Sequence, residues 1–496
     1  MAIGRHLSKI FPKNLKILMK IENNKNWKPN LHFFKEGHWI NDPNGLVYYQ
    51  NEYHLFYQMN PDDIVWGNMH WGHAVSSDGL HWTHCPIALF AEPDGLGYIF
   101  SGGGVVDQRN TSGFQEGDIT PVVLSFTHHD KDAVQRQSLA YSSDGLKTFH
   151  KYEGNPIIDN PGLKDFRDPK IIWVDNLNQW VMTVVAGQCA QFYSSSDLKE
   201  WNYLSKFGEG FGCHDGVWEC PDLFPLICAD TGETKWVLLI SINPGGFNGG
   251  SAMQYFIGDF VDGVFSCEDK QTRWLDYGTD FYAAISFDNI DLANKKRRVI
   301  AWMSNWHYAN ETPSSSYRSA MTLPRDIELV EIDNQYQLKM SLIPAFEELR
   351  QGILDEWNYE QSGMYKKISS PYECHLSINK KEIKDEALII EFSNESDEVL
   401  PIKFDVKNSK VIFDRQELNW NEKDFGRTII APIFWKDDML NIQIVVDNCA
   451  IELFINDGLT SMTNLIFPDQ AFSKILIKSK KFDRIEVCDH SLQKVW

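Results

Sequence analysis

The sequence predicts an all-β protein built from two domains, of which the first is a β-propeller. Three observations carry this prediction. The chain of 496 residues is longer than one compact core accommodates, its apolar runs are short and alternate with polar residues, and one motif recurs at blade-like intervals. Hydrophobic residues make up 43% of the chain and charged residues 23%, which is typical of a folded globular protein.

The region from about residue 31 to 324 consists of short β-like runs separated by Gly, Asp, Asn and Pro. Strands are predicted at 52–58, 121–126, 180–186 and 236–242. In many of these runs aromatic and β-branched residues alternate with polar ones, the pattern of a half-buried strand. Long helical periodicity is absent from this region, so we interpret it as all-β.

A short repeat indicates how these strands are grouped. Residues 76–82, SSDGLHW, recur in part as SSDGLKTF at 142–149 and as SSDLKEW at 195–201. The copies lie about 50 to 65 residues apart, which suits a propeller blade of four strands. Each copy would end one strand, turn at Asp-Gly and place an aromatic residue in the next strand. Coincidence among common turn residues is the alternative.

The pattern changes near residue 345, where we place the domain boundary. Residues 344–354 predict a short helix, which overlaps a linker of residues 345–358. Further strands joined by polar turns are predicted at 387–392, 402–406, 410–414, 440–446 and 451–455. They indicate a β-sandwich over residues 359–496, so that the propeller covers residues 31–344 and residues 1–30 form an N-terminal extension.

Charge and cysteine content limit the partners and the compartment. The formal net charge of -21 repels phosphate groups, so we expect a neutral small molecule rather than nucleic acid or a membrane surface. Nine scattered cysteines favour a reducing compartment, and residues 1–20 lack the apolar core of a signal peptide, which predicts a cytoplasmic protein. Cys213, His214, Cys220 and Cys228 match no common zinc spacing, so no metal is expected.

Three acidic residues stand in unusual surroundings. Asp42 lies in WINDPNG, Asp168 in FRDP and Glu219 in VWECPD. Arg167 would keep Asp168 ionised, whereas apolar neighbours such as Trp218 favour a protonated Glu219. Glycoside hydrolysis needs two carboxyl groups of opposite protonation, and this trio offers them. A structural turn around Asp42 and a structural ion pair at Asp168 are the alternatives, and these patterns alone leave several hydrolase classes open.

The order of these motifs resembles glycoside hydrolase family 32, which holds invertases, fructanases and phosphosucrose hydrolases. The resemblance continues through Phe100-Ser101-Gly102 and the segments 253–258, 275–278, 280–283, 302–306 and 321–325, and into the sandwich at 446–458. It implies a five-bladed β-propeller followed by a β-sandwich, in agreement with the strand pattern.

The resemblance also implies a role for each carboxylate. Asp42 matches the nucleophile of the family, Glu219 its acid/base, and Asp168 the carboxylate that binds fructose hydroxyls, with Arg167 orienting Asp168. This mechanism retains the configuration of the sugar and expects the two reacting carboxyl groups about 5 to 5.5 Å apart. The residues predicted to bind substrate are Asn41, Gln58, Trp66, Ser101, Arg167, Cys220, Tyr282 and Trp306. No cofactor is required.

Two features bear on the substrate. Gly103 stands where many relatives have Ser, which predicts a more permissive loop there. Segments 302–306 and 308–318 are more similar to exo-acting fructanases and invertases than to phosphosucrose hydrolases, and the cationic run 295–298 is interpreted as a solvated turn rather than a phosphate pocket. We therefore predict release of terminal fructose from sucrose and short fructo-oligosaccharides.

Several alternatives remain open from the sequence. Within the family they are a sucrose-6-phosphate hydrolase, an exo-levanase or inulinase, and a fructosyltransferase, in which a sugar hydroxyl replaces water. Outside enzymes, the alternative is a catalytically silent sugar-binding protein. The β-sandwich also offers a surface for a homo-oligomer.

Overall fold

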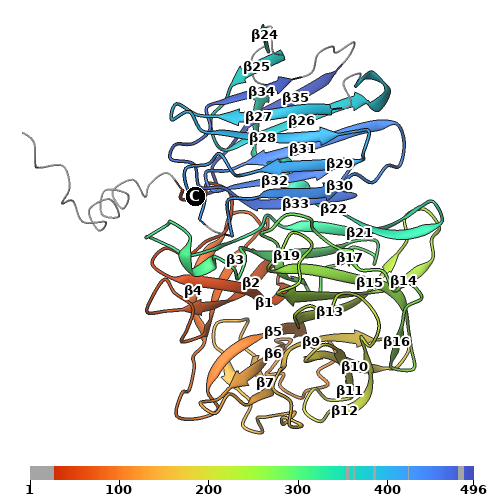
Figure 1. Cartoon of the computed structure of the whole chain (residues 1–496). Helices are drawn as coiled ribbons and strands as arrows, with labels where there is room; N and C mark the ends of the chain where they lie inside the picture. Colours follow the sequence, from red (N-terminus) through yellow and green to blue (C-terminus); the bar gives the residue numbers. More distant parts are fainter. Residues whose placement is uncertain (1–26, 354–356, 361–362, 384–386, 423, 479–484) are drawn as a thin grey trace, which may run out of the picture.

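The computed structural model describes residues 27–353, 357–360, 363–383, 387–422, 424–478 and 485–496. These residues form almost only β-strands, and Figure 1 shows a sandwich stacked on a propeller. Residues 1–26 of the predicted N-terminal extension lie outside the described residues. In the described ranges, no helix is long and apolar enough to cross a membrane.

Five antiparallel sheets form the blades of the propeller. Blade 1 comprises β1 (Trp39–Tyr49), β2 (Glu52–Asn60), β3 (His70–Ser76) and β4 (Thr83–Leu89). Blade 2 comprises β5 (Tyr98–Val106), β6 (Val122–His129), β7 (Gln135–Ser142) and β8 (His150–Lys151), and blade 3 comprises β9 (Phe166–Val174), β10 (Gln179–Ala186), β11 (Ala190–Ser195) and β12 (Asn202–Phe207). Blade 4 comprises β13 (Val217–Ile227), β14 (Thr234–Asn243), β15 (Ala252–Val261) and β16 (Val264–Ser266), with β17 (Arg273–Trp274) beside β15.

Blade 5 closes the propeller. It comprises β18 (Tyr282–Ser286), β19 (Arg297–Met303), β21 (Arg325–Ile332) and β22 (Gln335–Leu342), with β20 (Ala320–Met321) beside β19. A 3-10 helix, η1 (Ala309–Glu311), lies between β19 and β20. The inner strands β1, β5, β9, β13 and β18 contact one another in that cyclic order, and β18 contacts β1 again. The prediction of a five-bladed propeller is therefore confirmed.

The sequence repeat marks the same turn in three blades. Strand β3 ends at Ser76, β7 at Ser142 and β11 at Ser195. In each copy the serine hydroxyl donates to the aspartate two residues later, at 2.9, 2.9 and 3.1 Å. The repeat thus forms a side-chain-bonded turn between the third and fourth strands of a blade.

Irregular register marks every inner strand of the propeller. Bulges or shifts fall between Ile40 and Pro43 in β1, between Phe100 and Gly102 in β5, between Glu219 and Asp222 in β13, between Tyr282 and Ile285 in β18, and opposite β9 between Thr183 and Val185. The backbone has a positive φ of 64° at Asp168, 45° at Cys220 and 54° at Ala283. Such irregularities re-aim side chains and cluster at functional sites. In this propeller the bulges and the positive φ angles lie at or beside the predicted site residues.

Two antiparallel sheets form the sandwich. The six-stranded sheet has the order β23 (Arg350–Ile353), β35 (Glu486–Leu492), β26 (Tyr372–Asn379), β31 (Met439–Val446), β32 (Ala450–Ile455) and β33 (Thr460–Leu465). The seven-stranded sheet has the order β24 (Asn358–Glu360), β25 (Gly363–Lys367), β34 (Lys474–Lys478), β27 (Ala387–Ser393), β28 (Val399–Asp405), β29 (Lys410–Asp414) and β30 (Thr428–Pro432). Alternate apolar residues of both sheets fill one buried core, and a 3-10 helix, η3 (Lys380–Glu382), follows β26.

The chain enters the sandwich earlier than the sequence predicts. The expected helix over 344–354 is limited to a 3-10 helix, η2 (Pro344–Leu349). Arg350–Ile353 then forms β23, which pairs with β35, because Arg350 bonds to Glu373 on the outer face of the same sheet. Leu354 lies outside the described residues.

Buried ion pairs join the two domains. Arg415 of the sandwich donates to Asp280 Oδ2 at 3.1 Å and to Thr279 Oγ1 at 3.0 Å. Arg325 of blade 5 pairs with Glu452 of the sandwich at 3.2 Å. Because the segment of Asp280 continues directly into β18, the sandwich fixes the start of an inner strand of the propeller.

Candidate active site

The nucleophile candidate Asp42 sits at the bulge in β1. Its side chain is buried, and Ser101 Oγ donates to Asp42 Oδ2 at 2.5 Å. Its other oxygen, Oδ1, is buried and has no hydrogen-bond partner among the described residues. An unpaired buried carboxylate oxygen is costly, so its retention indicates a group that meets a ligand.

Asp168 comes from β9 in blade 3 and lies beside Asp42. Its Oδ2 accepts the backbone N–H of Cys220 at 2.9 Å, and the Cys220 thiol lies 3.6 Å from that oxygen and 3.7 Å from Asp42 Oδ2. The left-handed backbone at Asp168 and Cys220 brings strands β9 and β13 together at this point. One thiol therefore bridges two carboxylates.

Glu219 comes from β13 in blade 4 and is held by two donors. Arg167 donates to Glu219 Oε1 through Nη2 at 2.9 Å and through Nε at 3.2 Å. The Tyr282 hydroxyl, from β18 in blade 5, donates to Glu219 Oε2. Arg167 Nε lies 3.9 Å from Asp168 Oδ2, so this guanidinium orients Glu219 more closely than Asp168.

A cavity of about 250 Å³ contains the three carboxylates. Trp66 and Trp306 form part of its wall, with ring centroids 6.3 Å apart. Asn41 and Gln58 line it with amide groups that are oriented by neighbours: Asn41 Oδ1 accepts from Trp39 at 2.7 Å, and Gln58 Nε2 donates to the Ile99 carbonyl at 2.9 Å. All the predicted site residues thus meet at or beside one cavity.

Three further residues line this cavity that the sequence analysis did not place in the site, namely Phe100, Gln135 and Asp165. Asp165 Oδ1 accepts from Arg167 Nη1 at 2.7 Å, and Gln135 Oε1 accepts from the same atom at 3.3 Å. Phe100 belongs to the motif Phe100-Ser101-Gly102 and Asp165 directly precedes the motif FRDP, so these motifs were the available signal. Gln135 lies in an ordinary alternating strand, and nothing in the sequence marks it.

Comparisons with known proteins agree with this geometry. The family model for the glycosyl hydrolases family 32 N-terminal domain matches residues 32–341, and that for the family 32 C terminal matches residues 347–489. The chain belongs to glycosyl hydrolase family 32. It is a glycosidase of the fructofuranosidase type.

Individual relatives cover nearly the whole chain. It is 38% identical to a levanase of Bacillus subtilis, over 95% of this chain and 71% of that protein, and 36% identical to an invertase of Schizosaccharomyces pombe, over 89% and 80%. A crystal structure of exo-inulinase from Aspergillus awamori superposes with a TM-score of 0.88 at 29% identity, covering 95% of this chain and 99% of that one. A β-fructofuranosidase of Schwanniomyces occidentalis in complex with fructosyl-erythritol gives 0.85 at 31% identity, with the same coverage.

Two of the three carboxyl groups of this glycosidase have raised pKa values. Burial raises the pKa of Asp42 to about 6, against the bond from Ser101, and the charge of Glu219 raises it further. Burial likewise raises the pKa of Asp168 to about 7, although the charge of Arg167 opposes that rise. The prediction that Arg167 keeps the pKa of Asp168 low is therefore wrong, because burial has the larger effect. Neighbouring carboxylates titrate as a unit. Asp42 and Asp168 therefore hold their protons to a higher pH than ordinary aspartates do.

Two predictions about the neighbours of the site are wrong. Trp218 does not desolvate Glu219: adjacent strand residues face opposite ways, and the Trp218 ring is buried against His214 and Phe256. Gly103 is not in a permissive loop but within β5. A Cβ on Gly103 would lie 2.7 Å from Lys170 Cδ, so the close approach of the neighbouring blade, rather than the backbone angle, favours glycine.

The cationic run 295–298 is the predicted solvated turn only at Lys295, which is exposed in a turn. Strand β19 begins at Arg297, and the buried Arg298 pairs with Asp326 through two bonds of 2.8 and 2.9 Å. Lys296 pairs with Glu328 at 2.9 Å. As to metals, no group of three His, Cys, Asp or Glu side chains that could hold an ion occurs within the residues that the structure describes.

Proposed function

We propose that this family 32 enzyme releases terminal β-fructofuranosyl units from sucrose and short fructo-oligosaccharides. The convergence of Asp42, Asp168 and Glu219 from three blades in one cavity carries the proposal. That cavity, of about 250 Å³, is smaller than the roughly 300 to 1,000 Å³ of drug-sized sites. It suits a single sugar unit at the end of a chain.

The reaction proceeds in two displacements. Glu219 protonates the glycosidic oxygen while Asp42 Oδ1 attacks the anomeric carbon, so that the bond to the leaving group breaks and a fructosyl ester forms. The Glu219 carboxylate then takes a proton from water, whose oxygen attacks the same carbon and frees Asp42. Two inversions give net retention. The absence of any described partner for Asp42 Oδ1 supports its assignment as the attacking atom.

The other site residues hold these two groups in position. Ser101 fixes the non-attacking oxygen of Asp42. Arg167 and Tyr282 donate to the two oxygens of Glu219 and stabilise the carboxylate that serves as base in the second step. Asp168 is assigned to the hydroxyl groups of the bound fructosyl unit, because Cys220 occupies its Oδ2 only.

The lining of the cavity supports an unphosphorylated substrate. Of the described residues that line it, Arg167 is the single cation, and Asp165 and Glu219 already neutralise it. A phosphate group would find no unengaged cation there. Relatives named levanase and exo-inulinase support longer fructans as a second substrate class, and transfer of fructose to a sugar hydroxyl differs only in the acceptor of the second step.

We also propose a cytoplasmic location. All nine cysteines, each within the described ranges, are free thiols, as is usual in a reducing compartment. Relatives named extracellular exo-inulinase make secretion the alternative, which fractionation of the native host's cells would establish. A homo-oligomer through the β-sandwich stays a prediction that sedimentation would test.

Product analysis tests the proposed activity. Wild type and Glu219→Ala are incubated with sucrose, sucrose 6-phosphate, kestose and inulin. We expect rapid release of fructose from sucrose and kestose, and loss of that release in the variant. Preference for the phosphorylated sugar would instead indicate a phosphosucrose hydrolase. Binding without any release would indicate a silent sugar-binding protein.

A further inference from the structure

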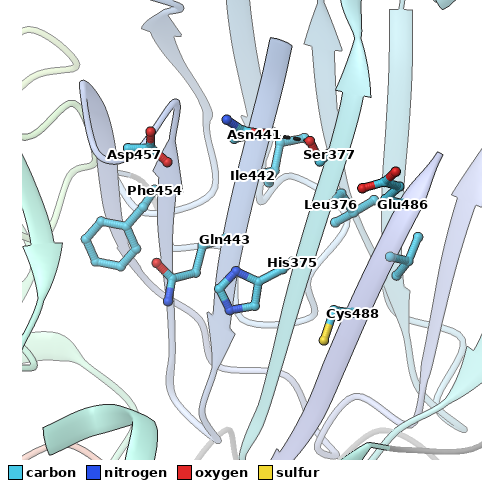
Figure 2. A pocket seen from close by; sticks show the side chains of 11 residues that line it. His375, Leu376, Ser377, Asn441, Ile442, Gln443, Phe454, Asp457, Glu486 and Cys488 are labelled. Carbon is cyan, nitrogen blue, oxygen red and sulfur yellow. Dashed lines mark hydrogen bonds between the residues drawn. The ribbon is translucent and has the colours of Figure 1, made fainter. Parts of the chain in front are cut away.

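A second cavity, of about 470 Å³, lies on the outer face of the six-stranded sandwich sheet. Figure 2 shows its side chains, which come from β26, β31, β32 and β35 and from the turn that follows β32. It is larger than the active-site cavity of about 250 Å³. The catalytic mechanism uses none of its residues.

The lining of this cavity combines apolar surface, from residues such as Phe454 and Val487, with polar groups that strand alternation turns outward. Leu376 and Ile442 point into the sandwich core, so Ser377, Asn441 and Gln443 between or beside them point outward. Ser377 Oγ donates to Asn441 Oδ1 at 2.7 Å, the bond drawn in Figure 2. Neighbouring strands thus present a row of hydrogen-bonding groups to the cavity.

The opposite outer face of the sandwich differs in chemistry. Strands β28, β29 and β34 place Lys403, Lys410 and Lys474 at their alternate, outward positions, as expected of a face that serves solubility. The described residues that line the cavity include neither Lys nor Arg. The two outer faces of the sandwich therefore differ in composition. Solubility alone does not explain the composition of the face that carries the cavity.

A buried carboxylate orients the polar groups of the cavity. Glu373 accepts from Arg350 Nε at 2.7 Å and Nη2 at 3.1 Å, from His375 Nε2 at 2.7 Å and from Gln443 Nε2 at 2.8 Å. Against the effect of burial, the bonds from His375 and Arg350 lower the pKa of Glu373 to about 2. The remaining polar atoms, His375 Nδ1 and Gln443 Oε1, bond to no other described residue and are held in place for a ligand.

The chemistry of the lining selects the class of ligand. The described residues of the lining include carboxylates and no Lys or Arg, which does not favour an anionic ligand. The apolar surface of Phe454 and Val487 lies beside the polar groups and suits the C–H surface of a ligand that also carries hydroxyl groups. Asp457 adds a carboxylate, which accepts hydroxyl protons. Planar amide, imidazole and carboxylate groups together match a neutral ligand with many hydroxyl groups.

The cavity also continues toward the propeller. A smaller cavity of about 80 Å³ shares Asn441 and Asp457 with it and includes Val330 and Lys339 of blade 5, together with Lys436. Both lysines are already paired with carboxylates, Lys339 with Glu328 at 3.5 Å and Lys436 with Asp230 at 3.1 Å. Figure 1 shows β21 and β22 of that blade next to the sandwich. A groove that runs across several strands suits an extended chain of sugar units better than a single unit.

We propose that this groove is a second, non-catalytic saccharide site that holds part of a fructan chain. The inference rests on the proposed function, since a fructan is the hydroxyl-rich polymer that the active site would degrade. It adds a contact that sucrose is too small to use. The groove therefore affects polymer substrates and leaves sucrose cleavage unchanged.

Substitution of Ser377 by tyrosine tests the groove, because an aromatic residue is favoured in a strand and would fill the cavity without removing any partner of Glu373. Lys403→Tyr on the opposite face is the matched control. We expect kcat/KM for sucrose within twofold of wild type in both variants. For inulin and levan, Ser377→Tyr should lose about fivefold or more in kcat/KM, the effect of losing one or two hydrogen bonds.

Binding is measured separately in chains inactivated by Asp42→Ala, by their retardation in native gels that contain inulin or levan. Retardation should weaken at least fivefold when Ser377→Tyr is added and persist with Lys403→Tyr. Asp457→Asn, which keeps a residue that tolerates the positive φ of 58°, should weaken it to a smaller extent. Equal polymer kinetics and retardation in all variants would overturn the proposal. A dimer in wild type that Ser377→Tyr abolishes would assign the groove to a second copy and also overturn it. Absence of sucrose cleavage by wild type would refute the proposed function instead, while the gels still report on the groove.

Discussion

Replacement of Asp42 by asparagine should stabilise the protein while it abolishes activity. The pKa of Asp42 is raised from its ordinary 3.8 to about 6, with burial as the main cause. A carboxyl group with a raised pKa takes up a proton on folding, so the folded state loses stability as pH rises from about 4 to 6, and the whole cost is present above pH 6. The difference of about 2 pH units corresponds to about 3 kcal/mol.

Thermal and denaturant unfolding at pH 4 and pH 8 measure this effect. Asp42→Asn should raise the free energy of unfolding by up to about 3 kcal/mol at pH 8 and by much less at pH 4, where the native carboxyl is already protonated. The control is Asp326→Asn, because Asp326 is also buried but is paired with Arg298. Loss of that partner should destabilise by about 3 to 5 kcal/mol. An equal gain at both pH values, or no gain at pH 8, would refute the reasoning.

Three further predictions follow from the site. Ser101→Ala removes a hydrogen bond to the ionised form of Asp42 and so raises the pKa of Asp42. The acid limb of the pH profile of kcat/KM should therefore move upward from about 6 by about one pH unit. An acid limb that does not move would contradict the assignment of Asp42 as nucleophile. Glu219→Gln should lower kcat on sucrose by about 10² to 10⁴, and near-normal turnover would exclude Glu219 as acid. Gly103→Ser should destabilise by about 1 to 3 kcal/mol, because its Cβ would lie 2.7 Å from Lys170 Cδ; a thermal midpoint equal to that of wild type would show that the blades separate easily.

Local sequence patterns predicted the fold where they were periodic. The SSDG repeat identified the turn after β3, β7 and β11 because a serine hydroxyl and an aspartate bond one another there irrespective of tertiary context. The boundary near residue 345 was less predictable. Arg350 enters a strand because Glu373, more than twenty residues away, receives it, and such a contact leaves no local pattern.

The active site likewise has features that local sequence motifs predicted and features that depend on tertiary contacts. Asp42, Asp168 and Glu219 adjoin Pro, Arg or Cys in short motifs, and the bulges that aim them lie in those motifs. The orientation of Trp218 and the role of Gln135 depend instead on strand facing and on the position of Arg167. These are tertiary properties, which explains why the first was predicted wrongly and the second was missed.

The stereochemistry of fructosyl transfer tests the central claim most directly. Wild type and Asp42→Asn are incubated with sucrose in the presence of methanol, and the products are assigned by NMR. A fructosyl ester on Asp42 predicts methyl β-fructofuranoside from wild type, by retention, and no methyl fructoside from the variant. The α-anomer from wild type, or the same product from Asp42→Asn, would contradict the account.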